Sequence, residues 1–413
     1  MHIQALEYTT ESADFFNKIQ HLSGSVWLDS GKPQSQFGRY CILSALPEKV
    51  INTSIESLDV HLRPELEAAS DINELPFCGG WIGFIDYNSN ARFGWYNWAI
   101  IIDHHQQLAK LVWRDSCPKK TIGTIISLIN AAQPIIDSMH CATFVADQPK
   151  ANYMAAIAKI HEYLRTGDCY QVNYTQRFSA DFRGSAYSAY LKLRKAVPSP
   201  FSAYLNLGNE QILSISPERF IQVCGRAAVT QPIKGTAARS LDPSEDEAAK
   251  VELYNSEKNR AENIMIVDLL RNDFNKNSAL FSVEVPKLFE VQSFNNVHHL
   301  VSTITGKLRP EISHPAFIAD CFPGGSITGA PKIRAMQIID ELEPHDRDIY
   351  CGSIGYFSCN GNSDFNIAIR TLKVTNGKAY AWAGGGIVLD SDPEQEYEES
   401  LAKIGAFLRA IEN

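Results

Sequence analysis

Short apolar runs separated by turn residues dominate the first 140 or so residues, and this pattern predicts strands. Residues 24–28 and 98–102 are the clearest examples. The run at 77–84 is punctuated by glycines, which predicts close packing of strands or a tight bend. We therefore expect this region to be rich in sheet.

Apolar positions at helical spacing appear later in the chain and predict helices at about 119–138, 151–165 and 256–273. Gly167 is expected to end the second helix before a strand at 170–174. Helices and hairpin-like strands then alternate without the regular rhythm of a doubly wound fold. This order favours an α+β fold with large antiparallel sheets.

A polar joint at 146–150 suggests a division of the chain into two parts, residues 1–145 and residues 146–413. With 413 residues and 45% hydrophobic content, the chain has enough apolar residues for one large core or two. The motifs that indicate chemistry all lie in the second part.

The formal net charge of −9 disfavours a nucleic-acid or anionic-membrane surface, since both need clustered cations. No apolar run is long enough to span a membrane, and the start of the chain does not resemble a signal peptide. A cytoplasmic location is expected. The nine cysteines include no C-x-x-C pair, so we expect reduced and mostly buried thiols.

Lys234 is the most informative residue, because its amine lies among apolar neighbours and directly before Gly235. Desolvation or a nearby cation lowers the pKa of an amine and makes it nucleophilic. A solvated charge at a strand end is the alternative. The choice between the two depends on which other residues share the site.

Glu218 precedes Lys234 by 16 residues, a span that suits two adjacent strands joined by a turn near Gly225. An acid and an amine would then face one pocket, with Glu218 as a general acid or base. An ion pair to Arg219 or another cation is the alternative. His299 is a second acid-base candidate, and the alternative there is a buried histidine with satisfied hydrogen bonds.

Glu262 shares a helix face with apolar residues at 265, 266 and 269, so its carboxylate is expected to point inward. A buried carboxylate needs a salt bridge or a metal ion. The C-terminal helix, which begins with the capping sequence 391–393, aligns three charged residues in one polar stripe. These are Glu396, Glu399 and Lys403. An exposed Glu399–Lys403 pair is the alternative reading of that stripe.

Two helices with inward carboxylates and no cysteine or histidine ligands suit Mg²⁺, which also takes oxygens from an anionic ligand. Arg370 is a candidate clamp for a carboxylate of that ligand, and the amides of residues 384–386 are a candidate cradle for another. An ordinary ion pair and a tight turn are the respective alternatives. The stretch 324–332 is not a Walker loop, because two residues separate its last glycine from Lys332.

The chain resembles the chorismate-utilising enzymes, and within that family the synthase subunits of para-aminobenzoate synthesis. The resemblance covers 145–413 closely and the N-terminal part more weakly. It rests on six segments, which are Gln171–Phe178, Ser216–Phe220, Pro232–Thr236, Ala261–Asn263, Gly324–Lys332 and Gly384–Val388. It implies two large antiparallel sheets packed face to face, with helices outside and the active site in the C-terminal part.

The resemblance also implies roles for individual residues. Glu262 and Glu399, with Glu396 nearby, would hold Mg²⁺ against the ring carboxylate of chorismate. The two carboxylates of the substrate would be bound by Arg370, Tyr350, Lys403 and the Gly385 and Gly386 amides, while His299 and Thr328 line the ring. Lys234 would attack ring carbon 2 while Glu218 protonates the departing 4-hydroxyl, and ammonia would then enter at carbon 4. The implied product is 4-amino-4-deoxychorismate, a precursor of folate.

Ammonia is expected from a separate glutaminase subunit, because the chain has no Gly-x-Cys-x-Gly nucleophile turn. Some relatives bind tryptophan in the N-terminal sheet. Ser30 is a candidate for such a pocket, and the question of tryptophan stays open.

Three other functions stay open as well. Anthranilate synthase component I is disfavoured because it usually has alanine at the Lys234 position. An isochorismate or salicylate synthase would carry a lysine base near the position of Gln171. A catalytically silent binding subunit would have no need of Glu218, Lys234, Glu262 and Glu399 together.

Overall fold

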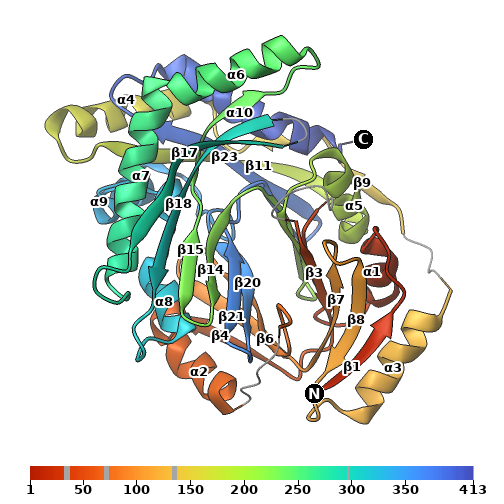
Figure 1. The fold of residues 1–413 in the computed structure, drawn as a ribbon. Coiled ribbons are helices and arrows are strands. Elements are labelled where there is room, and N and C mark those ends of the chain that lie inside the picture. The colour runs from red at the N-terminus through yellow and green to blue at the C-terminus, as the bar shows by residue number, and fades with distance from the viewer. Residues whose placement is uncertain (32–37, 69–73, 133–136, 295–296, 413) are drawn as a thin grey trace.

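A computed structural model of the chain describes residues 1–31, 38–68, 74–132, 137–294 and 297–412. Within these residues two large sheets lie face to face, and helices cover their outer sides (Figure 1). The strands pair in antiparallel fashion in both sheets. The predicted α+β class with two facing antiparallel sheets is confirmed.

The first sheet has 13 strands among the described residues. Eleven of them form its continuous path, and β19 (Gly329–Ala330) and β9 (Met139–Cys141) pair with β11 beside it. The path runs β1 (His2–Leu6), β8 (Leu108–Trp113), β7 (Trp98–Asp103), β3 (Tyr40–Ser44), β2 (Val26–Asp29), β12 (Phe201–Asn206), β13 (Glu210–Ser216), β22 (Thr371–Thr375), β23 (Lys378–Ile387), β11 (Gln171–Gly184) and β10 (Val145–Ala146).

The second sheet has 10 strands in the same part of the chain, with β17 (Glu284–Ser293) paired to β18. Its path runs β16 (Ile233–Ala238), β18 (Val297–Lys307), β15 (Ala227–Thr230), β14 (Arg219–Cys224), β21 (Asn362–Asn366), β20 (Ser353–Ser358), β5 (Gly80–Ile85), β6 (Asn90–Tyr96) and β4 (Lys49–Ser54).

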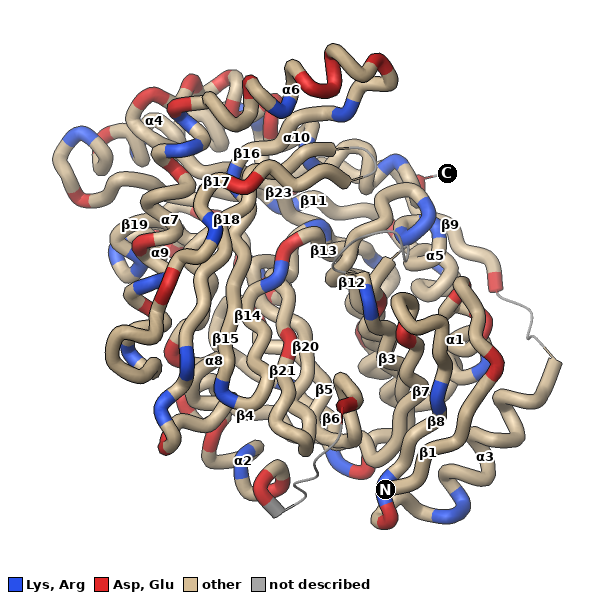
Figure 2. The backbone as a smooth tube through the Cα atoms, viewed as in Figure 1, with Lys and Arg blue, Asp and Glu red and all other residues tan. Residues whose placement is uncertain are grey.

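The helices lie outside the sheets, and charged residues are concentrated on helices and loops (Figure 2). They are α1 (Ala13–Ile19), α2 (Leu58–Ala68), α3 (Lys119–Asn130), α4 (Lys150–Thr166), α5 (Ala186–Ala196), α6 (Pro243–Asn255), α7 (Glu257–Asn275), α8 (His314–Cys321), α9 (Lys332–Leu342) and α10 (Pro393–Arg409). Two short 3₁₀ turns are η1 (Ile55–Ser57) and η2 (Gly325–Ile327). No helix in the described ranges combines the length and apolar character needed to cross a membrane.

The helices predicted at 151–165 and 256–273 are confirmed as α4 and α7. Gly167 ends α4 in the left-handed conformation at φ +80°, and Ser256 caps α7 by accepting a hydrogen bond from the Asn259 amide. The helix expected at 119–138 stops at Asn130, and residues 133–136 lie outside the described residues.

Strands from before and after residue 145 interleave in both sheets. In the first sheet β2 pairs with β12, and in the second β5 pairs with β20. Both sheets are therefore built from the two parts together, and neither sheet breaks at 145/146.

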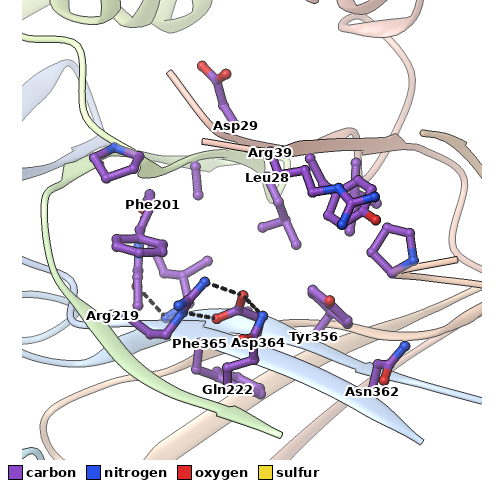
Figure 3. A pocket seen from close by; sticks show the side chains of 18 of the residues that line it. Leu28, Asp29, Arg39, Phe201, Arg219, Gln222, Tyr356, Asn362, Asp364 and Phe365 are labelled. Carbon is purple, nitrogen blue, oxygen red and sulfur yellow. Dashed lines mark hydrogen bonds and ion pairs between the residues drawn. The ribbon is translucent and has the colours of Figure 1, made fainter. Parts of the chain in front are cut away.

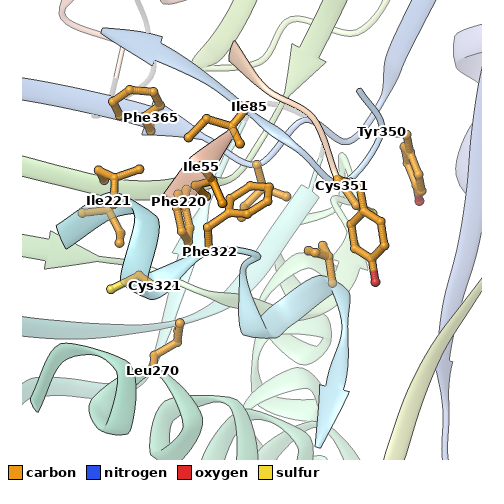
Figure 4. Packing of buried hydrophobic residues seen from close by; sticks show 14 of the residues in the cluster. Ile55, Ile85, Phe220, Ile221, Leu270, Cys321, Phe322, Tyr350, Cys351 and Phe365 are labelled. Atoms are coloured by element: carbon orange, nitrogen blue, oxygen red, sulfur yellow. The ribbon is translucent and has the colours of Figure 1, made fainter. Parts of the chain in front are cut away.

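The core has layers on both faces of the sheets. In β7, Ile100 and Ile102 pack toward the helices outside the first sheet, whereas Ala99 and Ile101 pack between the sheets. This burial on both faces explains the uninterrupted apolar run of that strand. Another cluster packs the outer helices against the second sheet, where the Phe220 and Phe322 rings meet edge to face and Leu270 contributes from α7 (Figure 4). All nine cysteines are free, and all but Cys224 are buried.

Candidate active site

Lys234 lies half-buried on β16, where Nζ donates a hydrogen bond to the backbone oxygen of Ser326 at 3.1 Å. Burial lowers the pKa of Lys234, and Lys403 adds to this effect, while Glu218 and Glu262 oppose it. Burial has the larger effect, so the environment favours the neutral amine.

Gly235 brings α7 close to Lys234. Its φ of +82° is in the left-handed region, and a Cβ atom there would lie 2.9 Å from the Asn259 side chain. Glycine satisfies both demands because it has no side chain. The Lys-Gly pair therefore allows α7 to approach the strand that carries the amine.

Glu218 lies between β13 and β14 and is 6% exposed. Burial raises its pKa, whereas Lys234 and hydrogen bonds from the Ser326 side chain and the Ile233 amide oppose the rise. The net direction is upward, so this carboxyl retains its proton to higher pH than a solvated glutamate.

The route by which Glu218 and Lys234 meet differs from the sequence prediction. The turn at Gly225 is confirmed, with φ +61°, but it joins β14 to β15. β16 instead follows β15 along the same side of β18, so the acid and the amine are not on adjacent strands. The two residues are still close, because Glu218 accepts a hydrogen bond from the amide of Ile233, the residue before Lys234, and the charge of Lys234 lowers the pKa of Glu218.

Glu262 projects from α7 near Lys234 and is half-buried. Its side chain makes no hydrogen bond or ion pair with another described residue. Burial raises its pKa, Lys234 and Lys258 lower it, and the charges of Glu396 and Glu399 raise it further. The carboxylates of α7 and α10 are therefore near enough to influence one another.

Helix α10 supplies the other charged groups. Glu399 pairs with Lys403 at 2.6 Å, and both side chains are about half exposed. Burial would raise the pKa of Glu399, but Lys403 outweighs it and the net shift is downward. Glu396 is buried and accepts a hydrogen bond from the Ser391 hydroxyl at 2.7 Å. The surface pair anticipated from the sequence exists, and it lies beside the buried carboxylate.

The donor set fits Mg²⁺. No group of three His, Cys, Asp or Glu side chains in the described ranges forms a complete protein cage. Mg²⁺ does not require one, since it keeps several waters and binds one or two carboxylates together with ligand oxygens. Glu262 is half-buried and lacks a protein cation at bonding distance among the described residues. A bound Mg²⁺ would neutralise the charge of this carboxylate.

Arg370 is a half-buried guanidinium in a left-handed backbone conformation, with φ +50°. Among the described residues its side chain has no carboxylate partner, and burial lowers its pKa. A desolvated guanidinium without a counter-ion is a ready clamp for a ligand carboxylate. The alternative of an ordinary ion pair for Arg370 is thus not seen among the described residues.

His299 belongs to β18 and lies near Arg370. Its Nδ1 is 2.8 Å from the Thr236 hydroxyl, and the ring is 6% exposed. Burial, followed by the charge of Arg370, lowers the pKa of His299 to about 4, against a hydrogen bond with the Gly235 backbone. The imidazole is therefore neutral at physiological pH.

Residues 384–386 belong to strand β23, and the tight-turn alternative is wrong. They pair with β11 on one side, while the pairing of β22 with β23 begins only at Ala381 and leaves their other edge open. The Asn173 amide points away from β23 to the Thr328 oxygen, so by strand alternation the opposite Gly386 amide faces the open edge. The same rule turns the Gly385 amide toward Tyr174.

Gly385 instead provides space. A Cβ atom at this position would lie 3.1 Å from Glu396 Oε2 and 3.4 Å from Lys403 Nζ. The Lys403 ammonium also donates to the Gly384 oxygen at 3.3 Å. The glycine strand and α10 therefore form one wall of the site.

Tyr350 and Thr328 are the remaining predicted residues. The Tyr350 ring stacks on Trp382 with centroids 6.1 Å apart, and burial raises its pKa well above the usual value. Thr328 is fully buried and its hydroxyl donates to the Gly324 oxygen at 3.1 Å. Thr328 thus helps to shape the 324–328 loop, and its contact with a substrate ring stays a prediction.

Residues 36–409 match the model of the chorismate binding enzyme family. The chain belongs to the chorismate-binding enzymes. It is 40% identical to aminodeoxychorismate synthase component 1 of Escherichia coli over 449 residues, covering 98% of each chain. It is also 43% identical to anthranilate synthase component 1 of Bacillus subtilis, over 65% of this chain and 52% of the relative.

Solved structures agree with the fold of this chorismate-binding enzyme. Anthranilate synthase component I from Streptococcus pneumoniae superposes with a TM-score of 0.80 at 30% identity, covering 91% of this chain and 93% of the other. The menaquinone-specific isochorismate synthase of Escherichia coli superposes with a TM-score of 0.81 at 20% identity, covering 100% and 95%. The second match concerns the fold alone.

Ser326 of this chorismate-binding enzyme was missed by sequence reasoning as part of the site, and Gln171 was considered only as the position of a possible lysine base. Ser326 contacts Lys234 through its backbone and Glu218 through its side chain. Gln171 is 2% exposed, its Oε1 has no hydrogen-bond partner, and its Nε2 would lie 2.0 Å from a Cβ atom on Gly386. The glycines at 324 and 325 were the available signal for Ser326, because they permit close approach of the loop.

A separate cavity of about 490 Å³ lies between the two sheets of the chorismate-binding enzyme (Figure 3). Leu28 and Phe201 line it from the first sheet, and the Arg219–Asp364 ion pair lines it from the second. Arg219 therefore pairs with Asp364 and not with Glu218.

The Ser30 hydroxyl, proposed for a tryptophan pocket, lies 3.3 Å from the Cys41 sulfur.

Proposed function

We propose that the chain is component 1 of aminodeoxychorismate synthase, which aminates chorismate at ring carbon 4 with ammonia to give 4-amino-4-deoxychorismate. The observation that carries the proposal is the pair of half-buried Lys234 and buried Glu218, held by one serine beside Glu262. The 40% identity to the Escherichia coli protein of that name over 98% of each chain supports it.

Chorismate carries two carboxylates, and the site offers matching cations. Arg370, Tyr350, Lys403 and the Gly386 amide are proposed to bind them. Glu262 and Glu399, with Glu396 next to them, would hold Mg²⁺, which when bound neutralises the ring carboxylate. His299 and Thr328 would lie along the ring, where a neutral imidazole adds no competing positive charge.

The chemistry proceeds in two displacements. The neutral Lys234 amine attacks ring carbon 2, the ring double bonds shift, and the C4–O bond breaks as Glu218 gives its proton to the departing hydroxyl. Ammonia then adds to carbon 4 and passes a proton to the Glu218 carboxylate, the double bonds shift back, and the C2–N bond breaks to release the neutral Lys234 amine. The net reaction consumes chorismate and ammonia and yields 4-amino-4-deoxychorismate and water.

The directions of the two pKa shifts support these roles. The first displacement needs a neutral amine and a protonated carboxyl, and burial favours both of these uncharged forms. A lysine that served only as a positive anchor would instead gain from an environment that raises its pKa.

Anthranilate synthase component I is the second candidate, since the Bacillus subtilis protein named anthranilate synthase component 1 shares 43% identity over 65% of this chain. It is disfavoured because the resemblance implies direct addition of ammonia at carbon 2, with no need of an amine at position 234. An isochorismate or salicylate synthase is disfavoured because the Gln171 amide cannot act as the base that activates water.

Ammonia is proposed to come from glutamine by way of a separate glutaminase subunit. The designation component 1 of the Escherichia coli relative is consistent with a second component. Free ammonium salts should replace that partner in a test with the isolated chain.

The proposal is tested by product analysis. The purified chain is incubated with chorismate, MgCl₂ and an ammonium salt at mildly alkaline pH, and the products are separated and identified by mass spectrometry. Formation of 4-amino-4-deoxychorismate supports the proposal. Anthranilate, isochorismate or salicylate would redirect it to a sister enzyme, and no turnover even with a glutaminase subunit would favour a silent subunit.

A further inference from the structure

A buried ion pair outside the predicted site connects three segments that support the site, which are the 342–347 segment, η2 and β11. Arg347 and Glu343 have side chains that are 1% and 5% exposed. Arg347 Nη2 lies 2.7 Å from Glu343 Oε1, and Arg347 Nε lies 2.9 Å from Glu343 Oε2. The pair is therefore bidentate and shielded from water.

The two side chains also form hydrogen bonds with residues of η2 and β11. Arg347 Nη1 donates to the Ile327 oxygen at 2.9 Å, and Nη2 donates to the Asn173 oxygen. Glu343 Oε1 accepts from both the amide and the hydroxyl of Thr175, each at 2.8 Å. The pair thus ties the 342–347 segment to η2 and to strand β11.

The contact with Ile327 leads directly to the reacting groups. The preceding residue, Ser326, accepts the hydrogen bond of Lys234 through its backbone oxygen and contacts Glu218 through its side chain. Asn173 adds a second hold on the same loop, because its Nδ2 donates to the Ile327 oxygen at 3.2 Å. A shift of the Ile327 carbonyl would therefore move the residue that holds the amine and the acid together.

Stability alone does not account for this arrangement. A buried ion pair must offset the desolvation of both charges, and well-packed apolar residues of similar volume often stabilise a core as much. A guanidinium, in contrast, fixes several carbonyl groups in a defined geometry, and a reacting group displaced by about 1 Å can lose about 10²-fold in rate.

We propose that Arg347 and Glu343 are positioning residues that fix Ser326, and through it Lys234 and Glu218, in the geometry required for reaction. The proposal rests on the function proposed above. It assigns no contact with substrate to either residue.

A matched control exists elsewhere in the chain. Arg194 Nε lies 2.6 Å from Asp29 Oδ2, and both residues are buried. This pair connects α5 to β2 and α1 and shares no contact with Ser326, Lys234 or Glu218. Replacing Arg194 by lysine should disturb a buried ion pair without displacing the loop at 324–328.

The experiment compares Arg347→Lys, Glu343→Gln and Arg194→Lys with the unmodified chain, using ammonium as the nitrogen source. We expect kcat to fall by about 10-fold to 100-fold in the first two variants, with KM for chorismate changed by less than about threefold. The acid limb of the pH profile should move as well, because Lys234 loses a fixed partner. The Arg194→Lys variant should retain kcat and the profile even if its melting temperature falls equally.

The proposal is overturned if Arg347→Lys and Glu343→Gln retain the kcat and the pH profile of the unmodified chain. It is also overturned if all three variants, including Arg194→Lys, lose kcat to an extent that follows their loss of melting temperature. A crystal structure of Arg347→Lys gives a readout independent of turnover. Displacement of the Ser326 oxygen from Lys234 Nζ supports positioning, and an unchanged loop contradicts it. Absence of the expected product from the unmodified chain would refute the proposed function, which is a different outcome.

Discussion

The side-chain amine of Lys234 donates a hydrogen bond to the backbone oxygen of Ser326 over 3.1 Å, and the Ser326 side chain contacts Glu218. One serine therefore holds a base and an acid that burial pushes toward their uncharged forms. Because the two groups interact, they titrate as a pair with macroscopic pKa values. This coupling leads to the first prediction.

The pH profile of kcat/KM for chorismate should be bell-shaped. The pKa of Glu218 is raised and that of Lys234 is lowered, so both limbs should lie inside the interval from about 4.3 to about 10.4 set by the free side chains. Activity falls at low pH as the amine becomes fully protonated, and at high pH as the carboxyl becomes fully ionised. A flat profile across this interval would contradict the assignment.

The Glu218→Gln variant should lose about 10²-fold to 10⁴-fold in kcat, the usual contribution of a general acid, with little change in KM. The amide keeps the size of the side chain but has no proton to give to the departing hydroxyl. Steady-state kinetics with ammonium measures the effect. Glu210→Gln is a suitable control, because Glu210 pairs with Lys373 and Arg92 away from Ser326. Equal losses in both variants would refute the acid role.

The Glu262→Gln variant should bind Mg²⁺ more weakly and yet be more stable without metal. Burial and the charges of Glu396 and Glu399 raise the pKa of Glu262, so above that pKa the ionised group destabilises the fold. Melting temperature should therefore rise in the metal-free variant, and added Mg²⁺ should stabilise it less than it stabilises the unmodified chain. An identical Mg²⁺-induced shift in both proteins would place the metal elsewhere.

The Arg370→Lys variant should raise KM for chorismate by about 10-fold to 100-fold, because lysine cannot form the bidentate contact of a guanidinium with a carboxylate. The effect on kcat should be smaller, since the proposed contact is present before reaction. Initial rates over a range of chorismate concentrations separate the two. A loss confined to kcat would mean that Arg370 acts on the transition state and not on binding.

The sequence predicted the fold class and the helices that carry Glu262 and Glu399, because periodicity and capping residues are local signals. It did not predict that β16 follows β15 along β18, because that order depends on long-range pairing. The glycines at 384–386 were compatible with a turn, and only their pairing with β11 and the end of the β22–β23 pairing at Ala381 show that they form an open strand edge.

Residues that support the site without carrying its chemistry were the hardest to predict. Arg347 lies in a charged stretch that resembles an exposed loop in the sequence, yet its side chain is 1% exposed. Its partners Asn173 and Ile327 are 174 and 20 residues away in the chain. No pattern of residue types reveals contacts of that kind, since they arise only when separate elements pack together.

The most direct test of the central claim compares the products of the unmodified chain and a Lys234→Ala variant, each supplied with chorismate, Mg²⁺ and ammonium. The account predicts 4-amino-4-deoxychorismate from the unmodified chain and loss of amination at carbon 4 in the variant, with any remaining product being anthranilate. If the variant forms 4-amino-4-deoxychorismate at an unchanged rate, Lys234 has no part in the reaction. If the unmodified chain yields anthranilate, the proposed function itself is contradicted.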